Sequence, residues 1–176
     1  MTQNKYILAP VLVGLIVALT ANTSAAMADD STVLETTVAL NSQGEYEGQF
    51  DTLIAAVQSS DPVVQEALSS QESNLTVFAP TDEAFDEIGL DETNVDQISE
   101  QQLTGILTYH VSEGAKTAEN VSSVDSLQTL NGQNITVQNG TLVDQTNTSA
   151  NITVTDIQTS NGIIHVIDSV LIPETQ

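Results

Sequence analysis

Two apolar runs lie far apart in this chain of 176 residues, and each has the composition of a buried β-strand. The first extends from Leu75 to Ala79 and is stopped by Pro80, which has no N–H for a strand ladder. The second extends from Ile163 to Leu171 and follows Asn161-Gly162, a pair typical of turns. We therefore expect both segments to adjoin within one hydrophobic interior.

Helices are predicted before and after the first run. Four apolar residues recur with the spacing of one helix face: Phe50, Leu53, Ile54 and Val57. Asp61 and Pro62 combine an N-cap with a proline at the first helical position, which predicts the start of a second helix. Thr81 can cap a brief helix through Ile88, and Ser99 with Gln102 forms a capping-box pattern before a longer one.

The second half of the chain has the period of β-strands. Beyond residue 126, apolar residues alternate with polar ones, as at Ile135 and Val137. Asn139-Gly140 is a strong hairpin turn, and Leu142 opens the return strand. Helices first and strands later, with short connections, predict an α+β fold that is mainly antiparallel.

The charge of the chain excludes several classes of partner. Its 24 acidic residues against two lysines give a formal net charge of −22, and Lys116 is the only basic residue after Lys5. Such a surface repels nucleic acids and anionic membranes. It is typical of a protein from a halophilic microbe, although a merely acidic soluble protein is the alternative. We expect cooperative folding to be lost in dilute buffer and regained in molar salt.

The first 28 residues have the layout of a secretory signal peptide, with Lys5, the apolar run Ile7–Leu19 and small residues that end at Ala28. The run is shorter than the roughly 20 residues that span a bilayer, although an uncleaved anchor is the alternative. We assign residues 29–46 to a linker or a loosely held N-terminal segment, 47–173 to one folded domain and 174–176 to a tail. No cysteine is present, so disulfides are excluded.

The sequence offers little catalytic or metal chemistry. His110 and His165 are the only histidines, and their spacing matches no metal motif, even with Asp82 or Asp168 as a carboxylate ligand. No nucleophile elbow, phosphate loop or dinucleotide glycine pattern is present. The acids could pair as in a glycosidase, but the chain has few aromatic residues to hold a sugar, so we interpret them as a solvated shell. We predict no enzyme and no cofactor.

Two longer blocks contain the apolar runs: Thr76–Phe85 (TVFAPTDEAF) and Asn161–Pro173 (NGIIHVIDSVLIP), with Tyr109-His110 between them. In this order they resemble the fasciclin-like domain family, over roughly residues 47–173. The resemblance implies a wedge of two mainly antiparallel β-sheets flanked by several short helices. It also implies a non-catalytic extracellular adhesion or interaction module. The signature residues that it implies are Thr81, Asp82, Phe85, Tyr109, His110, Asn161, Gly162, His165 and Asp168.

We expect these signature residues to be structural. Tyr109 should bury its ring and direct its hydroxyl to a partner, and His165 should be a satisfied core group. His110 is expected to hydrogen-bond near the turn at residues 81–82. Asp82 and Asp168 are expected to act as backbone caps and turn locks and not as acid and base.

Glycan acceptors are another candidate class of surface site. Six N-x-Ser/Thr triplets follow the signal segment, although an Asn- and Thr-rich sequence also produces them by accident. They lie at Asn74, Asn120, Asn134, Asn139, Asn147 and Asn151. We expect Asn147 and Asn151 to be the most accessible, and Asn74 and Asn139 to be less convincing.

The remaining expectations concern partners. Asp156-Ile157 resembles a short adhesion determinant of animal family members, although we prefer a plain strand. Lys116, between Glu113 and Glu119, predicts an exposed ion pair. The expected partner is a cell-surface or matrix protein or a glycan, without direct membrane binding after signal cleavage. The alternative function is small-ligand binding in a pocket between sheet and helices.

Overall fold

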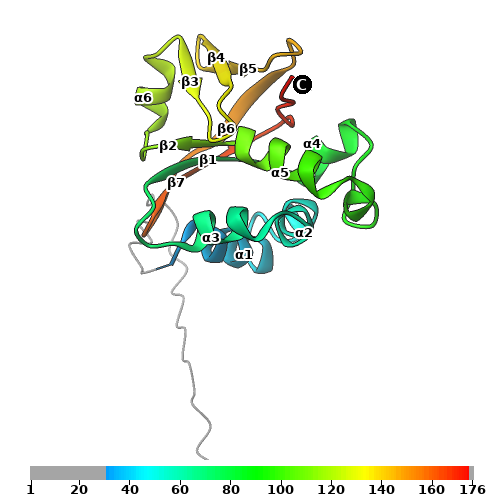
Figure 1. Ribbon diagram of the computed structural model, residues 1–176. Helices are drawn as coiled ribbons and strands as arrows, with labels where there is room; N and C mark the ends of the chain where they lie inside the picture. The colour runs from blue at the N-terminus through cyan, green and yellow to red at the C-terminus, as the bar shows by residue number, and fades with distance from the viewer. Residues whose placement is uncertain (1–30, 175–176) are drawn as a thin grey trace, which may run out of the picture.

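The computed structural model describes residues 31–174 (Figure 1). The expected signal peptide, residues 1–28, lies outside the described residues. Helices dominate the first half and strands the second, so the predicted α+β class is confirmed. Among the described residues, none of the helices has the length and apolar character needed to cross a membrane.

The helices are short. They are α1 (Val33–Ser42), α2 (Asp51–Ser59), α3 (Pro62–Ser69), α4 (Asp82–Glu87), α5 (Glu100–Tyr109) and α6 (Ala118–Ser122), with a 3-10 turn η1 (Val95–Gln97). The predicted caps begin three of them. The Asp61 carboxylate accepts the Val63 N–H before α3, and the Thr81 hydroxyl accepts the Ala84 N–H before α4. Ser99 caps α5 in the same way. These helix starts are confirmed because capping depends on local residues.

Helix α1 replaces the linker or loose strand expected before residue 47, so that expectation is wrong. Thr32 and Glu35 form a capping box, in which the Glu35 carboxylate accepts the Thr32 N–H at 2.9 Å. The N–H of Val33 donates to the Asn161 side-chain oxygen at 2.7 Å, and Val33 is buried. The helix is therefore anchored to the domain at its first turn.

One seven-stranded sheet organises the fold. Its strands are β1 (Leu75–Pro80), β2 (Val111–Glu113), β3 (Ser126–Gln128), β4 (Asn134–Gln138), β5 (Thr141–Val143), β6 (Ser149–Thr159) and β7 (Gly162–Ile167). Their spatial order is β2-β1-β7-β6-β5-β4-β3. Only β1 and β7 are parallel, so the sheet is mainly antiparallel as expected.

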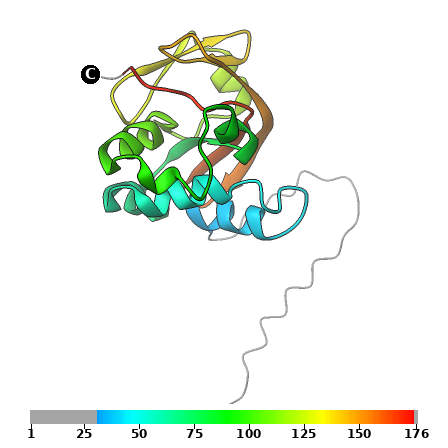
Figure 2. The same cartoon turned by 90° about the vertical axis from the view of Figure 1, so that its right-hand side faces the viewer.

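The sheet curls until it nearly closes into a barrel. Strand β6 pairs with β7 on one side and β5 on the other, so the two expected sheets are two halves of one surface. A bridge between Ser112 and Thr129 joins the two edge strands, β2 and β3. Figures 1 and 2 show β3, β4 and β5 at one end of the molecule and α1, α2 and α3 at the other.

Strands β1 and β7 lie between two hydrophobic clusters. Val77 and Ile164 face the cluster shared with the helices, whereas Phe78 and Ile167 face the cluster inside the barrel half. Every residue of both strands is buried. The expectation that the two apolar runs adjoin in one interior is confirmed, because Leu75–Pro80 pairs in register with Gly162–Ile167.

The last strand is shorter than predicted, and its turn lies one residue earlier. Strand β7 ends at Ile167 and not at Leu171, although Leu171 remains buried. The turn consists of Ser160 and Asn161, and Gly162 already belongs to the strand. A Cβ atom at position 162 would lie 2.9 Å from the carbonyl carbon of Leu75 and closer still to its oxygen. Glycine is required there for close backbone approach and not for a turn.

Candidate functional site

His165 connects three parts of the barrel half. It is buried on β7 and stacks on Phe78 with ring centroids 5.8 Å apart. Its Nδ1 accepts the Asp156 N–H at 3.2 Å, and its Nε2–H donates to the Lys116 carbonyl oxygen at 2.9 Å. Because Nδ1 must accept, the ring is held neutral, and burial lowers its pKa below the ordinary 6.5.

His110 connects α5 to the C-terminal segment. Its Nδ1–H donates to the Ile106 carbonyl oxygen at 2.8 Å, and its Nε2 accepts the Leu171 N–H at 3.0 Å. Burial lowers its pKa from 6.5 to about 4. The expected contact with the turn at residues 81–82 is therefore wrong. Helix α5 ends at Tyr109, so the ring of residue 110 folds back onto the carbonyl group one turn earlier.

Both histidines use their ring nitrogens in hydrogen bonds to backbone groups. All four nitrogens have a backbone hydrogen-bond partner, which leaves no lone pair for a metal ion or for proton transfer. Within residues 31–174, no group of three or more histidine and carboxylate side chains could hold a metal ion. The geometry of the two histidines is that of scaffold residues.

Tyr109 and Phe85 fill the two hydrophobic clusters. Tyr109 is fully buried in the barrel half, and its hydroxyl donates to the Asn134 carbonyl oxygen at 3.1 Å. Burial raises the pKa of this phenol. Phe85 is buried in the helix-side cluster, one turn after the Thr81 cap. Neither aromatic ring is available at the surface.

Asp82 and Asp168 hold backbone segments at a distance along the chain. The Asp82 carboxylate accepts the N–H groups of Asp51 at 3.1 Å and Thr52 at 2.9 Å, at the start of α2. The Asp168 carboxylate accepts the backbone N–H of Asn151 at 2.7 Å and its side-chain amide at 2.9 Å. Each carboxylate is engaged by donors of another segment.

Asn161 is a buried junction, 1% exposed. Its amide nitrogen donates to the carbonyl oxygens of Leu68 at 3.0 Å and Ser70 at 2.9 Å, at the end of α3. Its oxygen accepts the Val33 N–H, so one side chain joins α1, α3 and the β6–β7 turn.

The Asp156-Ile157 pair lies at an irregularity of β6, where the register with β7 shifts. Asp156 has a left-handed φ of 61°, and its carboxylate accepts the Ala118 N–H at 2.9 Å, at the start of α6. Ile157 packs against the helix-side cluster. Both side chains are engaged within the fold, and the pair lies in a strand as we preferred, but at an irregularity of that strand.

The six candidate glycan acceptors all have exposed side chains: Asn74, Asn120, Asn134, Asn139, Asn147 and Asn151. They differ in whether the side-chain amide makes a hydrogen bond within the protein. The nitrogen of Asn151, the atom that a glycan would modify, donates to Asp168, and the Asn74 oxygen accepts the Ala115 N–H. Asn147 and Asn151 are both exposed, and glycan attachment at either stays a prediction.

Asp144 is a structural carboxylate that the sequence analysis missed. It is buried, and one of its oxygens accepts the N–H groups of Thr146 and Thr148, each at 2.8 Å. The other oxygen accepts the Ile172 N–H at 2.8 Å. The local signal was the Asp-x-Thr-x-Thr spacing, because aspartate readily accepts from N–H groups two residues on. The contact with Ile172 had no local signal.

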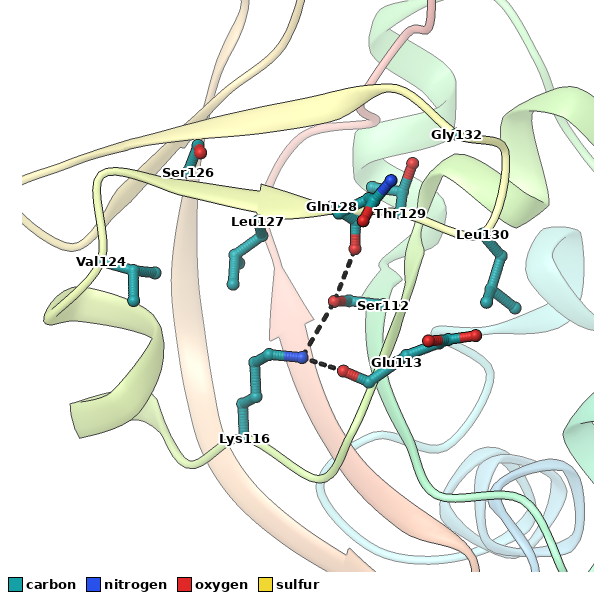
Figure 3. A pocket seen from close by; sticks show the side chains of 10 residues that line it. All are labelled: Ser112, Glu113, Lys116, Val124, Ser126, Leu127, Gln128, Thr129, Leu130 and Gly132. Atoms are coloured by element: carbon teal, nitrogen blue, oxygen red, sulfur yellow. Dashed lines mark hydrogen bonds between the residues drawn. The ribbon is translucent and has the colours of Figure 1, made fainter.

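Lys116 lies in a groove between β2 and β3 (Figure 3). The expected exposed ion pair is wrong, because the side chain is half-buried and its ammonium donates to neutral oxygens. These are the Ser112 hydroxyl, at 3.2 Å, and the Glu113 backbone carbonyl. The groove encloses about 500 Å³. By contrast, the space between α1, α2 and the sheet is about 30 Å³, which holds no ligand larger than a water molecule.

A family profile described as "Fasciclin domain" matches residues 48–173. Protein sll1483 of Synechocystis sp. is 41% identical over 128 residues, which cover 70% of this chain and 67% of that protein. Immunogenic protein MPB70 of Mycobacterium bovis is 34% identical over 127 residues, 71% of this chain and 64% of that protein. Transforming growth factor-beta-induced protein ig-h3 of Sus scrofa is 32% identical, over 72% of this chain but only 18% of its own length.

A solved structure has the same fold. It is a FAS1 domain pair from the insect cell adhesion molecule Fasciclin I, with a TM-score of 0.61 and 21% sequence identity. The match covers 80% of this chain and 50% of that chain. This chain therefore corresponds to one part of several longer relatives.

Proposed function

We infer the function from one premise: the chain belongs to the fasciclin domain family. We propose that it is a non-catalytic adhesion or interaction module at the cell surface or in the extracellular matrix. Its partner would be a surface or matrix protein or a glycan. The single observation that carries the proposal is the match of the family profile to residues 48–173, and the solved structure with the same fold is described as a cell adhesion molecule.

The use of the signature residues supports a role without chemistry. The two signature blocks form the buried β1–β7 pair at the centre of the sheet. The ring nitrogens of His110 and His165 are bonded to backbone groups, and the Asp82 carboxylate caps α2. Such residues stabilise a shape, so recognition would fall to exposed loops and edges.

We propose that residues 1–28 direct export and that the processed chain acts outside the cell. The charge supports a salt-rich setting, because Asp144 is the only acidic side chain buried within residues 31–174 and the other acids there are at least partly exposed. Repulsion among them falls as salt shortens the screening length to about 3 Å at molar concentration. We expect a cooperative thermal transition in molar NaCl that weakens in dilute buffer. An unchanged transition in salt-free buffer would contradict the halophilic assignment.

Capture of a partner tests the adhesion role. The folded chain is immobilised and incubated with surface and matrix fractions of the source organism in molar salt. A matched control is Gly162→Ala, which preserves the charge but places a Cβ against the Leu75 backbone. We expect a surface component that is retained by the native chain and not by this variant. Equal retention on both, or none on either, would count against the proposal.

Glycan attachment at the exposed asparagines is a separate proposal. Asn147 is one of four acceptors, with Asn120, Asn134 and Asn139, whose exposed side chains make no hydrogen bond within the described residues. The intact mass of protein from the native host measures this directly. A mass equal to that of the unmodified processed chain would remove the proposal.

A further inference from the structure

The seam groove is the space between the edge strands β2 and β3. Near one end the strands touch: the Leu130 N–H donates to the Val111 carbonyl oxygen at 2.8 Å, and the Ser112 hydroxyl donates to the Gln128 carbonyl oxygen at 2.8 Å. The groove opens beside this contact and encloses about 500 Å³. That volume lies within the roughly 300–1,000 Å³ of small-molecule sites.

The ammonium of Lys116 projects into the seam groove (Figure 3). An ammonium carries three protons. One donates to the Ser112 hydroxyl and one to the Glu113 carbonyl oxygen, while no described residue accepts the third. Lys116 is the only lysine or arginine in positions 31–174. The ammonium is therefore bonded to neutral oxygens, while the Glu113 carboxylate, which also lines the groove, attracts it without a direct hydrogen bond.

Other side chains of the groove offer both polar and apolar contacts. The Ser126 hydroxyl and the Gln128 amide are exposed and make no hydrogen bond within the described residues. Val124 and Leu130, which are 39% and 37% exposed, flank them. They are two of the five large apolar side chains that the described surface exposes. The groove thus combines one cation, the exposed carboxylate of Glu113, unpaired hydrogen-bonding groups and apolar surface.

We propose that the seam groove binds a small hydroxylated carboxylate, of the class represented by uronic acids. The ligand carboxylate would accept the third proton of Lys116, as a charge-assisted hydrogen bond. Its hydroxyl groups would bond Ser126 and Gln128, and its apolar ring face would cover Val124 and Leu130. The acidic surface elsewhere repels anions, so this position is the one in residues 31–174 where a carboxylate meets a positive charge. The proposal does not depend on the adhesion role, since it concerns a small molecule.

Lysine-selective NMR provides the test. Lys116 is the only lysine after residue 28, so a sample of the processed chain with ¹³C at lysine Cε reports on this site alone. Galacturonate is titrated in molar NaCl, in parallel with galactose, which lacks the carboxylate, and acetate, which lacks the hydroxyls. We expect galacturonate to shift the Lys116 signal saturably and to bind about tenfold more tightly than either reference. A Lys116 signal that does not move, or equal binding of galactose, would overturn the proposal.

Three variants locate the site, with binding measured by isothermal titration calorimetry because Lys116→Gln removes the NMR probe. Lys116→Gln should weaken galacturonate binding at least about tenfold, whereas Gln58→Glu, an equal change of charge on the exposed face of α2, should leave it unchanged. Equal weakening by both would mean that only the overall charge matters, which contradicts the site. Ser126→Ala removes an exposed hydroxyl that makes no hydrogen bond within the described residues, so the variant should fold normally. It should weaken galacturonate binding severalfold. If the single variants Ser126→Ala and Lys116→Gln both leave galacturonate binding unchanged, the proposal is also overturned.

Discussion

Inside the sheet, β1 and β7 (the central pair) bury every side chain, whereas the two edge strands, β2 and β3, bury only some of theirs. The central pair is held on both faces by apolar clusters and by the backbone bonds of His165. The edge pair touches at one bridge and then opens into the seam groove. The contrast separates residues that maintain the shape from residues that are free to contact a ligand. Changes at the centre should therefore affect stability, and changes at the edge should affect binding.

The largest effect is expected at Gly162. In Gly162→Ala the new Cβ meets the Leu75 backbone, which cannot move without breaking the β1–β7 register. We expect a loss of more than about 4 kcal/mol in the free energy of unfolding, or no folded protein, as measured by denaturant titration in molar salt.

Gly105 provides the matched control for that substitution. It lies inside α5 with open space around its Cβ position and an ordinary φ. Gly105→Ala should raise stability by about 0.5–1 kcal/mol. Similar effects of the two substitutions would show that the central pair is not closely packed.

The next effect concerns pH and His110. The folded-state pKa is about 4 against 6.5 in the unfolded chain, so the unfolded chain binds the extra proton first. Stability is fully present above pH 6.5 and falls as the pH drops toward 4, by about 3 kcal/mol from this residue. The lowered pKa of His165 acts in the same direction.

Denaturant titration over this pH range measures the slope. In His110→Gln the loss should be smaller than in the native chain by about the same 3 kcal/mol, whatever the stability of the variant at neutral pH. Identical slopes in the two proteins would indicate that the ring is not held neutral.

A moderate effect is expected at Asp156, which links the central pair to α6. Asp156→Ala loses the bond to the Ala118 N–H and leaves a Cβ residue at φ 61°, so we expect a loss of about 2 kcal/mol. Asp156→Asn retains an acceptor oxygen and tolerates this backbone conformation, and should lose less than about 1 kcal/mol. Thermal melting of the pair checks the order, and an equal loss would contradict it.

The smallest effect on stability is expected at Lys116. Its bonds go to a hydroxyl and a carbonyl group at an open edge, so Lys116→Gln should change the free energy of unfolding by less than about 1 kcal/mol. Denaturant titration at neutral pH measures it. A loss as large as that of Asp156→Ala would place Lys116 among the structural residues and blur the contrast between centre and edge.

Features that depend on residues close together in the sequence could be predicted, whereas features that depend on distant residues could not. The caps at Asp61 and Thr81 and the hairpin turn at Asn139-Gly140 were predictable, because each depends on residues within one turn. Helix α1 was not predicted, although Thr32 and Glu35 have the spacing of a capping box. Its apolar face is weak, and the residue that anchors its first turn, Asn161, is distant in the sequence.

The partners of the candidate site residues were harder to predict. The ring of His110 accepts the N–H of Leu171, which lies 61 residues further along the chain. For Lys116, the neighbouring acids suggested an ion pair, but the ammonium reaches the backbone of Glu113 and not a carboxylate. The seam groove is lined by residues from segments 112–116 and 124–132, and no local sequence pattern predicts that these two segments lie together.

The position of β7 has a consequence for the order of events during synthesis. The last strand of the described residues, β7, lies between β1 and β6, inside the sheet and not at an edge. Until residues 162–167 have been synthesised, β1 and β6 both lack the strand that pairs with them, so neither part of the sheet is complete. We therefore expect the sheet of the nascent polypeptide to stay open until residues 162–167 have emerged.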